Sequence, residues 1–224
     1  MRYPFLIYHL PVPIKKFLLS FLLLAILVIS SQPESVIIPV TYLLDESGVT
    51  EQLSLDPELT SFILSISDPD SSKLEGIYIE DKLQFPITSQ PTNNPGFVSN
   101  SPDSITSFST ADKYGSIGLI AHNHLAGESF FQIDADDEIC LVYGSGQVEK
   151  YVVSEIREYK ALSPNSPFSS FIYLSTPDVT ISYQDLFFET YGIKDRLVLQ
   201  TCISRDEVES WGRLFIIASP VDPN

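Results

Sequence analysis

Basic residues, cysteines and histidines are all scarce in this chain of 224 residues. It has 13 Lys and Arg against 29 Asp and Glu, which gives a formal net charge of -16 at pH 7. A chain this acidic is a poor partner for nucleic acid or for an anionic membrane surface, because both attract basic proteins. The two cysteines and three histidines form no group with the spacing of a zinc site, and no glycine-rich phosphate loop occurs. We therefore expect no bound metal or cofactor.

Residues 1–32 are typical of an export signal. Three basic residues, Arg2, Lys15 and Lys16, precede an uncharged apolar run of 13 residues at 17–29. This order occurs in cleaved signal peptides and in N-terminal membrane anchors, and both alternatives stay open. We expect an extracytoplasmic protein, anchored in the cell membrane or secreted, that touches the membrane through this segment only. The rest of the chain has ten basic and 29 acidic residues, a net charge of -19.

The chain after this segment is predicted to be mostly β. Its hydrophobic content of 44% is enough to bury one good core. We expect an N-terminal extension with strands at 33–72 and one main domain at 73–220. Short apolar runs between turn residues indicate strands, and Ser182 with Asp185 three residues later indicates the start of a helix. The predicted elements of the main domain are strands at 76–87, 117–122, 138–143 and 147–156, polar loops at 91–109 and 162–171, and a strand pair near the end.

That strand pair contains a cysteine and an arginine. In residues 197–203, Cys202 shares a face with Val198 and Gln200, because successive side chains of a strand alternate. If this run pairs with residues 211–218 as an antiparallel hairpin around 204–210, one register places Cys202 opposite Arg213 on the same face. A cation there would stabilise a thiolate or a developing oxyanion. The pair therefore indicates nucleophilic chemistry.

These residues, taken with a histidine upstream, resemble the sortases, which are cysteine transpeptidases. Ile-Ala-His at 120–122, Leu-Gln-Thr-Cys at 199–202 and Arg213 before an apolar strand follow the order of the sortase motifs. The resemblance covers residues 74–220. Val198 stands where the sortase motif begins with Thr, and Ala121 where sortases often have Gly.

The resemblance implies a fold and a reaction. It implies a closed β-barrel with one or two short helices, in which His122, Cys202 and Arg213 are catalytic. Cys202 would form a thioester with a sorting-signal peptide, and His122 would move protons to and from the two amines. Arg213, helped by the backbone N–H after it or by Thr201, would hold the oxyanion or position the substrate. The implied partners are a secreted protein with a C-terminal sorting signal and an amine on the cell envelope.

Several alternatives stand beside this interpretation. The same Cys and His could serve a hydrolase, or the barrel could bind a peptide or an envelope polymer without catalysis. Cys140 and Cys202 could form a disulfide and so remove the nucleophile, although the apolar strand around Cys140 favours simple burial. His124 competes with His122, and we favour His122 because it ends an apolar strand that would fix its backbone.

A calcium site is a further alternative, since some sortases use calcium. Four acidic residues at Asp134, Asp136, Asp137 and Glu138 invite it, but they lack the glycine and the final Glu of an EF-hand loop. We expect a solvated turn there.

Overall fold

The computed structural model describes residues 43–44, 50–51, 56–68 and 71–221. The predicted signal or anchor at 1–32 lies outside these residues. The chain divides into two units, Met1–Leu53 and Ser54–Asn224. Within the first unit, β1 (Leu43–Leu44) and β2 (Thr50–Glu51) form an antiparallel pair. No helix of the described part is long and apolar enough to cross a membrane.

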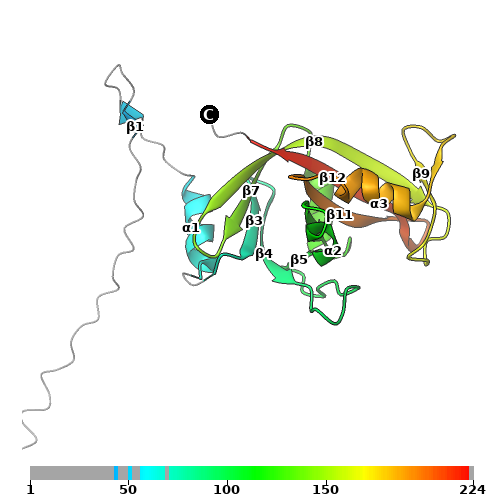
Figure 1. Cartoon of the computed structure of the whole chain (residues 1–224), viewed down its shortest axis with the longest axis horizontal. Coiled ribbons are helices and arrows are strands. Elements are labelled where there is room, and N and C mark those ends of the chain that lie inside the picture. The colour runs from blue at the N-terminus through cyan, green and yellow to red at the C-terminus, as the bar shows by residue number, and fades with distance from the viewer. Residues whose placement is uncertain (1–42, 45–49, 52–55, 69–70, 222–224) are drawn as a thin grey trace, which may run out of the picture. The chain divides into compact units, whose positions relative to one another are not determined.

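The second unit contains a closed barrel of eight strands (Figure 1). Around the ring the order is β8-β12-β11-β6-β5-β4-β3-β7, and the pairing of β7 with β8 closes it. β11 pairs with β6 in parallel, as β4 does with β5, and the other pairings of the ring are antiparallel. The closed β-barrel predicted above is confirmed. Its strands are β3 (Leu74–Ile79), β4 (Leu83–Ser89), β5 (Ile105–Ser107), β6 (Ile117–Ile120), β7 (Glu138–Tyr143), β8 (Val148–Ala161), β11 (Leu197–Arg205) and β12 (Val208–Pro220).

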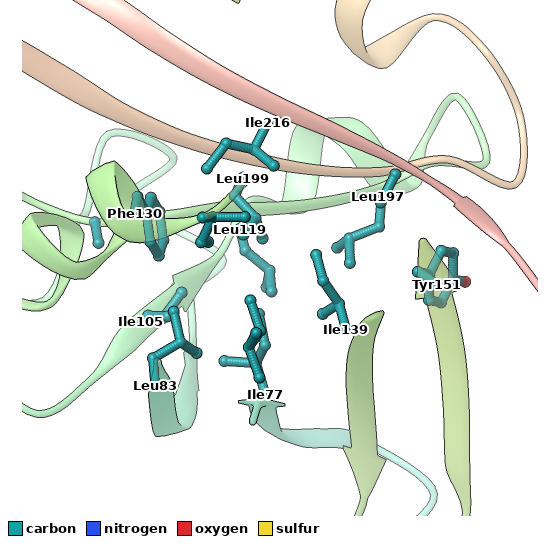
Figure 2. Packing of buried hydrophobic residues seen from close by; sticks show 14 of the residues in the cluster. Ile77, Leu83, Ile105, Leu119, Phe130, Ile139, Tyr151, Leu197, Leu199 and Ile216 are labelled. Atoms are coloured by element: carbon teal, nitrogen blue, oxygen red, sulfur yellow. The ribbon is translucent and has the colours of Figure 1, made fainter. Parts of the chain in front are cut away.

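Side chains that alternate along the strands fill the barrel interior. Figure 2 shows Ile77, Leu119, Ile139 and Leu199 directed toward one another from four different strands. Each of these four is completely buried. Burying such a side chain contributes about 1.5–3 kcal/mol, so the interior is the main source of stability of this unit.

The outer face of β11 and β12 is covered by helix α3 (Tyr183–Tyr191), as Figure 1 shows. The helix begins where predicted, because the Ser182 hydroxyl accepts a hydrogen bond from the backbone N–H of Asp185 at 3.1 Å. Leu186 and Tyr191 on its buried side pack against Val198 of β11. Two short strands, β9 (Phe171–Tyr173) and β10 (Thr180–Ile181), connect β8 to this helix.

Other elements differ from the prediction. The predicted strand 76–87 is the hairpin of β3 and β4, and its turn includes Asp81 with φ 57°. The predicted loop 91–109 contains β5, whose Ile105 is completely buried. Three helices were not predicted: α1 (Pro57–Ile66), α2 (Ser109–Asp112) and the 3-10 helix η1 (Ala126–Gln132).

Candidate active site

Cys202 and Arg213 are direct partners in the β11–β12 ladder, as the sequence predicts. Leu199 and Leu214 of the same strands point into the core, so Cys202 and Arg213 point out of the barrel. Cα partners of an antiparallel pair hold their Cβ atoms about 4.5–5.5 Å apart. The ladder therefore fixes the thiol and the guanidinium stem as neighbours.

The parallel pairing of β6 with β11 brings His122 to the same level. Ile120 is the partner of Gln200, and the Ala121 N–H still donates to the Gln200 carbonyl at 3.2 Å. His122 and Cys202 each lie two residues after this pair, one following β6 and the other within β11. Both line one cavity of about 510 Å³. The sequence did not predict this parallel pairing, because the paired residues of β6 and β11 lie 80 positions apart in the chain.

Cys202 is a half-buried free thiol, whereas Cys140 is a deeply buried one. Only 4% of Cys140 is exposed, and it lies under α1 beside Tyr78 and Val142. Burial raises the pKa of the Cys140 thiol to about 11. The disulfide alternative is not formed, and only Cys202 opens into a cavity with a histidine.

His122 is held by its backbone on both sides. Its carbonyl accepts hydrogen bonds from the N–H groups of Leu125 and Gly127, each at 3.0 Å. The preceding carbonyl, of Ala121, accepts from the Thr201 hydroxyl at 2.9 Å. A Cβ on Gly127 would lie 2.4 Å from the Thr201 hydroxyl oxygen, so this close approach requires glycine.

Thr201 has a different place from the one implied by the resemblance. It is 2% exposed and lies on the core face of β11, opposite to Cys202. Its hydroxyl is engaged with the Ala121 carbonyl, beside the histidine. The structure therefore places Thr201 with the backbone of the His122 loop and away from the cavity of the thiol.

The electrostatic surroundings of His122 favour its neutral form. Partial burial lowers the pKa of His122, the nearby His124 lowers it further, and Glu209 raises it in part. The rings of His122 and His124 are stacked with their centroids 5.5 Å apart. A neutral imidazole is a proton acceptor, which suits a base beside a thiol.

The Arg213 guanidinium faces a second hollow next to this cavity. Its Nη1 donates to the carbonyls of Ser210 at 3.0 Å and Gly212 at 2.8 Å, and it lies 5.9 Å from the Phe171 ring centroid. This hollow, of about 470 Å³, lies between α3 and the outward faces of β11 and β12. Gln200 also lines it, with its side-chain oxygen held by the Tyr191 hydroxyl at 2.9 Å. Half of its lining residues are aromatic: Phe108, Tyr114, Phe171, Tyr183, Phe187, Phe188, Tyr191 and Phe215.

The structure thus brings Cys202 and His122 into one cavity and Arg213 to its border with the aromatic hollow. No hydrogen bond joins the three side chains in the described part of the chain. The aromatic hollow was missed by sequence reasoning. The polar Gln200 on the outward face of an otherwise apolar strand was the available signal for it.

The acidic residues after η1 form an ion-paired turn. Lys82 contacts Asp134 at 2.8 Å and Asp137 at 2.6 Å, and Asp136 occupies the left-handed region with φ 70°. Across the described residues, no three His, Cys, Asp or Glu side chains are grouped to hold a metal ion.

No protein-family model and no curated protein matches this sequence. Solved structures similar to the chain include several sortases. Sortase A of Listeria monocytogenes is 13% identical, with 67% of this chain and 88% of that chain covered and a TM-score of 0.41. Sortase C1 of Streptococcus agalactiae is 14% identical, with coverage of 78% and 80% and a TM-score of 0.43. Sortase C-1 of Actinomyces oris is 16% identical, with coverage of 77% and 83% and a TM-score of 0.43.

Proposed function

We propose that this protein is a sortase-like cysteine transpeptidase. It cleaves a sorting-signal peptide through a thioester on Cys202 and transfers the acyl group to an amine on the cell envelope. The observation that carries the proposal is the shared cavity of Cys202 and His122, with Arg213 opposite Cys202 in the ladder.

In the first half-reaction, Cys202 Sγ attacks a backbone carbonyl of the peptide. The neutral His122 imidazole takes the thiol proton as the C–S bond forms. The C–N bond then breaks, and the leaving amine receives that proton from His122. The acyl group remains on Cys202 as a thioester, which divides one difficult amide exchange into two easier steps.

In the second half-reaction, the acceptor amine attacks the thioester carbonyl. His122, neutral again, takes a proton from this amine, and a new C–N bond forms. The C–S bond breaks, and the departing Cys202 sulfur takes the proton back from His122. The site returns to its starting state without an added oxidant, reductant or cofactor.

Arg213 positions the peptide or holds the oxyanion. Its guanidinium uses one nitrogen for two carbonyls of its own hairpin, and the rest of the fork borders the aromatic hollow. A peptide lying along β11 in that hollow would reach Cys202 with its scissile carbonyl beside Arg213. One well-placed donor to an oxyanion contributes about 3 kcal/mol to catalysis.

The partners follow from the same proposal. The donor is a secreted protein with a C-terminal sorting signal, and the acceptor is an envelope amine. Residues 1–32 direct export as a cleaved signal or as an anchor, and as an anchor they supply the membrane contact with the site on the outer side. The excess of 29 acidic over 13 basic residues leaves nucleic acid out.

The test is an exchange assay on the purified protein. A library of peptides with C-terminal sorting-type sequences is incubated with and without amine acceptors, and products are identified by mass spectrometry. We expect acyl transfer to the amine and a trapped thioester on Cys202, both absent from Cys202→Ala. Cleavage that ignores the amine would make the protein a hydrolase. Binding without any bond cleavage would make it a non-catalytic barrel.

A further inference from the structure

We propose that Asn123 is a positioning residue of this site, which latches the His122 loop to the hairpin that carries Cys202 and Arg213. This inference rests on the proposed function, because it concerns the same two reacting side chains. Asn123 follows the histidine directly and does not belong to the motif that identified the site.

The latch is a closed set of three hydrogen bonds. The Asn123 side-chain N–H₂ donates to the Ser204 hydroxyl at 2.6 Å and to the backbone carbonyl of Glu209 at 3.1 Å. The Ser204 hydroxyl donates to that same carbonyl at 3.1 Å. An asparagine amide has two N–H donors, and both are used. Asn123 therefore joins the loop after β6 to both strands of the β11–β12 hairpin.

The hairpin tip needs such a support. The β11–β12 ladder is irregular between Ile203 and Arg205, so Ser204 leaves the regular pairing. Beyond it the turn residues Asp206 and Glu207 both have positive φ, 51° and 63°. The bulge interrupts the ladder two residues after Cys202, and Asn123 bonds to the hairpin at this interruption.

The latch completes a pair of clamps around His122. On one side of the histidine, the Ala121 carbonyl is bound by Thr201, one residue before Cys202. On the other side, Asn123 is bound to Ser204, two residues after Cys202. The two clamps together fix the separation of the imidazole and the thiol. Reaction rates are sensitive to this separation, since a displacement of about 1 Å costs roughly 100-fold.

The outer clamp is open to solvent, which separates its effect on catalysis from its effect on folding. Its bonds are exposed, whereas the Thr201 bond is buried. When an exposed hydrogen bond is removed, water can bond to the groups that lose their partner, so the variant should fold with nearly unchanged stability. The expected loss therefore falls on the turnover number and not on stability.

The experiment compares Asn123→Ala, Ser204→Ala and the double variant with the wild-type protein. Single-turnover thioester formation should slow about 10- to 100-fold in Asn123→Ala, with KM changed less than about twofold. Ser204→Thr keeps the hydroxyl that Ser204→Ala removes, so its rate should stay close to that of the wild type. The double variant should be no slower than Asn123→Ala, because both changes break one network. Asn93→Ala is the matched control, an exposed asparagine between β4 and β5 whose side chain bonds to no described residue.

A second readout needs no peptide. The rate of Cys202 alkylation is measured as a function of pH in the wild type and in His122→Ala. A change of rate with pH that is present in the wild type and absent from His122→Ala reports the titration of the imidazole beside the thiol. We expect Asn123→Ala to weaken this change of rate and Asn93→Ala to keep it.

The outcomes are distinct. A wild-type rate in Asn123→Ala, additive losses in the double variant, or a fall in melting temperature that accounts for the lost rate would each overturn the latch. The latch would also be overturned if the wild type and His122→Ala had the same alkylation profile. In that case the His122 imidazole would not influence the Cys202 thiol, and Asn123 would have no coupling to maintain. If the peptide assay fails for every variant while this change of alkylation rate with pH still depends on Asn123, the proposed function is wrong and the latch stands.

Discussion

Replacing Thr201 by valine tests how the inner clamp works. Valine has nearly the same shape, so β11 keeps its packing, but the hydroxyl that donates to the Ala121 carbonyl is lost. Thr201 is 2% exposed, so water cannot easily replace this donor. The change therefore removes one buried hydrogen bond beside His122 and leaves the cavity side of β11 untouched.

The expected cost follows from that burial. Leaving a buried polar group without its partner costs about 1–3 kcal/mol. In a domain of this size each kcal/mol lowers the melting temperature by about 2–4 °C, so we expect a fall of about 2–12 °C. The His122 loop should also shift, and thioester formation should slow by about tenfold or more. Thr201→Ser keeps the donor and should keep the rate, with a smaller loss of stability from the missing methyl group.

The assay combines thermal unfolding with single-turnover thioester formation on the same samples. A Thr201→Val protein with an unchanged melting temperature and a large loss of rate would refute the reasoning. That pattern would mean that the hydroxyl contacts the oxyanion during the reaction and has little structural role. Equal rates in Thr201→Val and wild type would likewise remove Thr201 from the support of His122.

Four further predictions concern the site directly. His122→Ala should abolish thioester turnover and His124→Ala should only weaken it, with equal circular dichroism; the reverse ranking would contradict the assignment. His124 lowers the pKa of His122, so His124→Ala should raise that pKa and move the acid limb of kcat/KM to higher pH, where wild type still holds a neutral imidazole. Arg213→Lys keeps the charge but loses the planar, two-pronged hydrogen bonding of the guanidinium, so kcat/KM should fall at least about tenfold. A wild-type value of kcat/KM would mean that Arg213 forms no geometrically specific hydrogen bond to the substrate. Iodoacetamide should label Cys202 before Cys140, since burial shields the latter and raises its pKa to about 11; equal protection of both would count against the nucleophile.

Local patterns in the sequence were sufficient for the hairpin that carries the site. The alternation around Cys202 and Arg213 has a period of two, so the pattern places both on the outward face with leucines inside, and the observed register pairs the two residues directly. The cap at Ser182 was equally readable, because its partner Asp185 is three residues away.

Helix α1 was also readable but was missed. Asp56 accepts a hydrogen bond from the Glu58 N–H at 3.0 Å, and Pro57 occupies the first turn, both common signals of a helix start. Leu59, Phe62 and Ile63 then follow at helical spacing and are buried.

Other features depend on contacts between distant segments. The direction of the Arg213 guanidinium is set by carbonyls of its own hairpin and by Phe171, which lies 42 positions earlier in the chain. The aromatic hollow needs α2, α3 and three strands, β9, β11 and β12, at once. The Asn123 latch joins segments 81 and 86 residues apart. No local sequence pattern predicts these contacts between distant segments.

The central position of β12 has a consequence for how the protein is made. β12 pairs with β8 on one edge and with β11 on the other, yet it is the last described strand to be synthesised. Until it emerges, those two strands keep open edges that can join other chains. Ring closure then links segments far apart in sequence, which makes folding slow. Because Arg213 belongs to β12, the position opposite Cys202 stays unfilled until this strand joins the ring, so the arrangement of the candidate site is complete only when the ring closes.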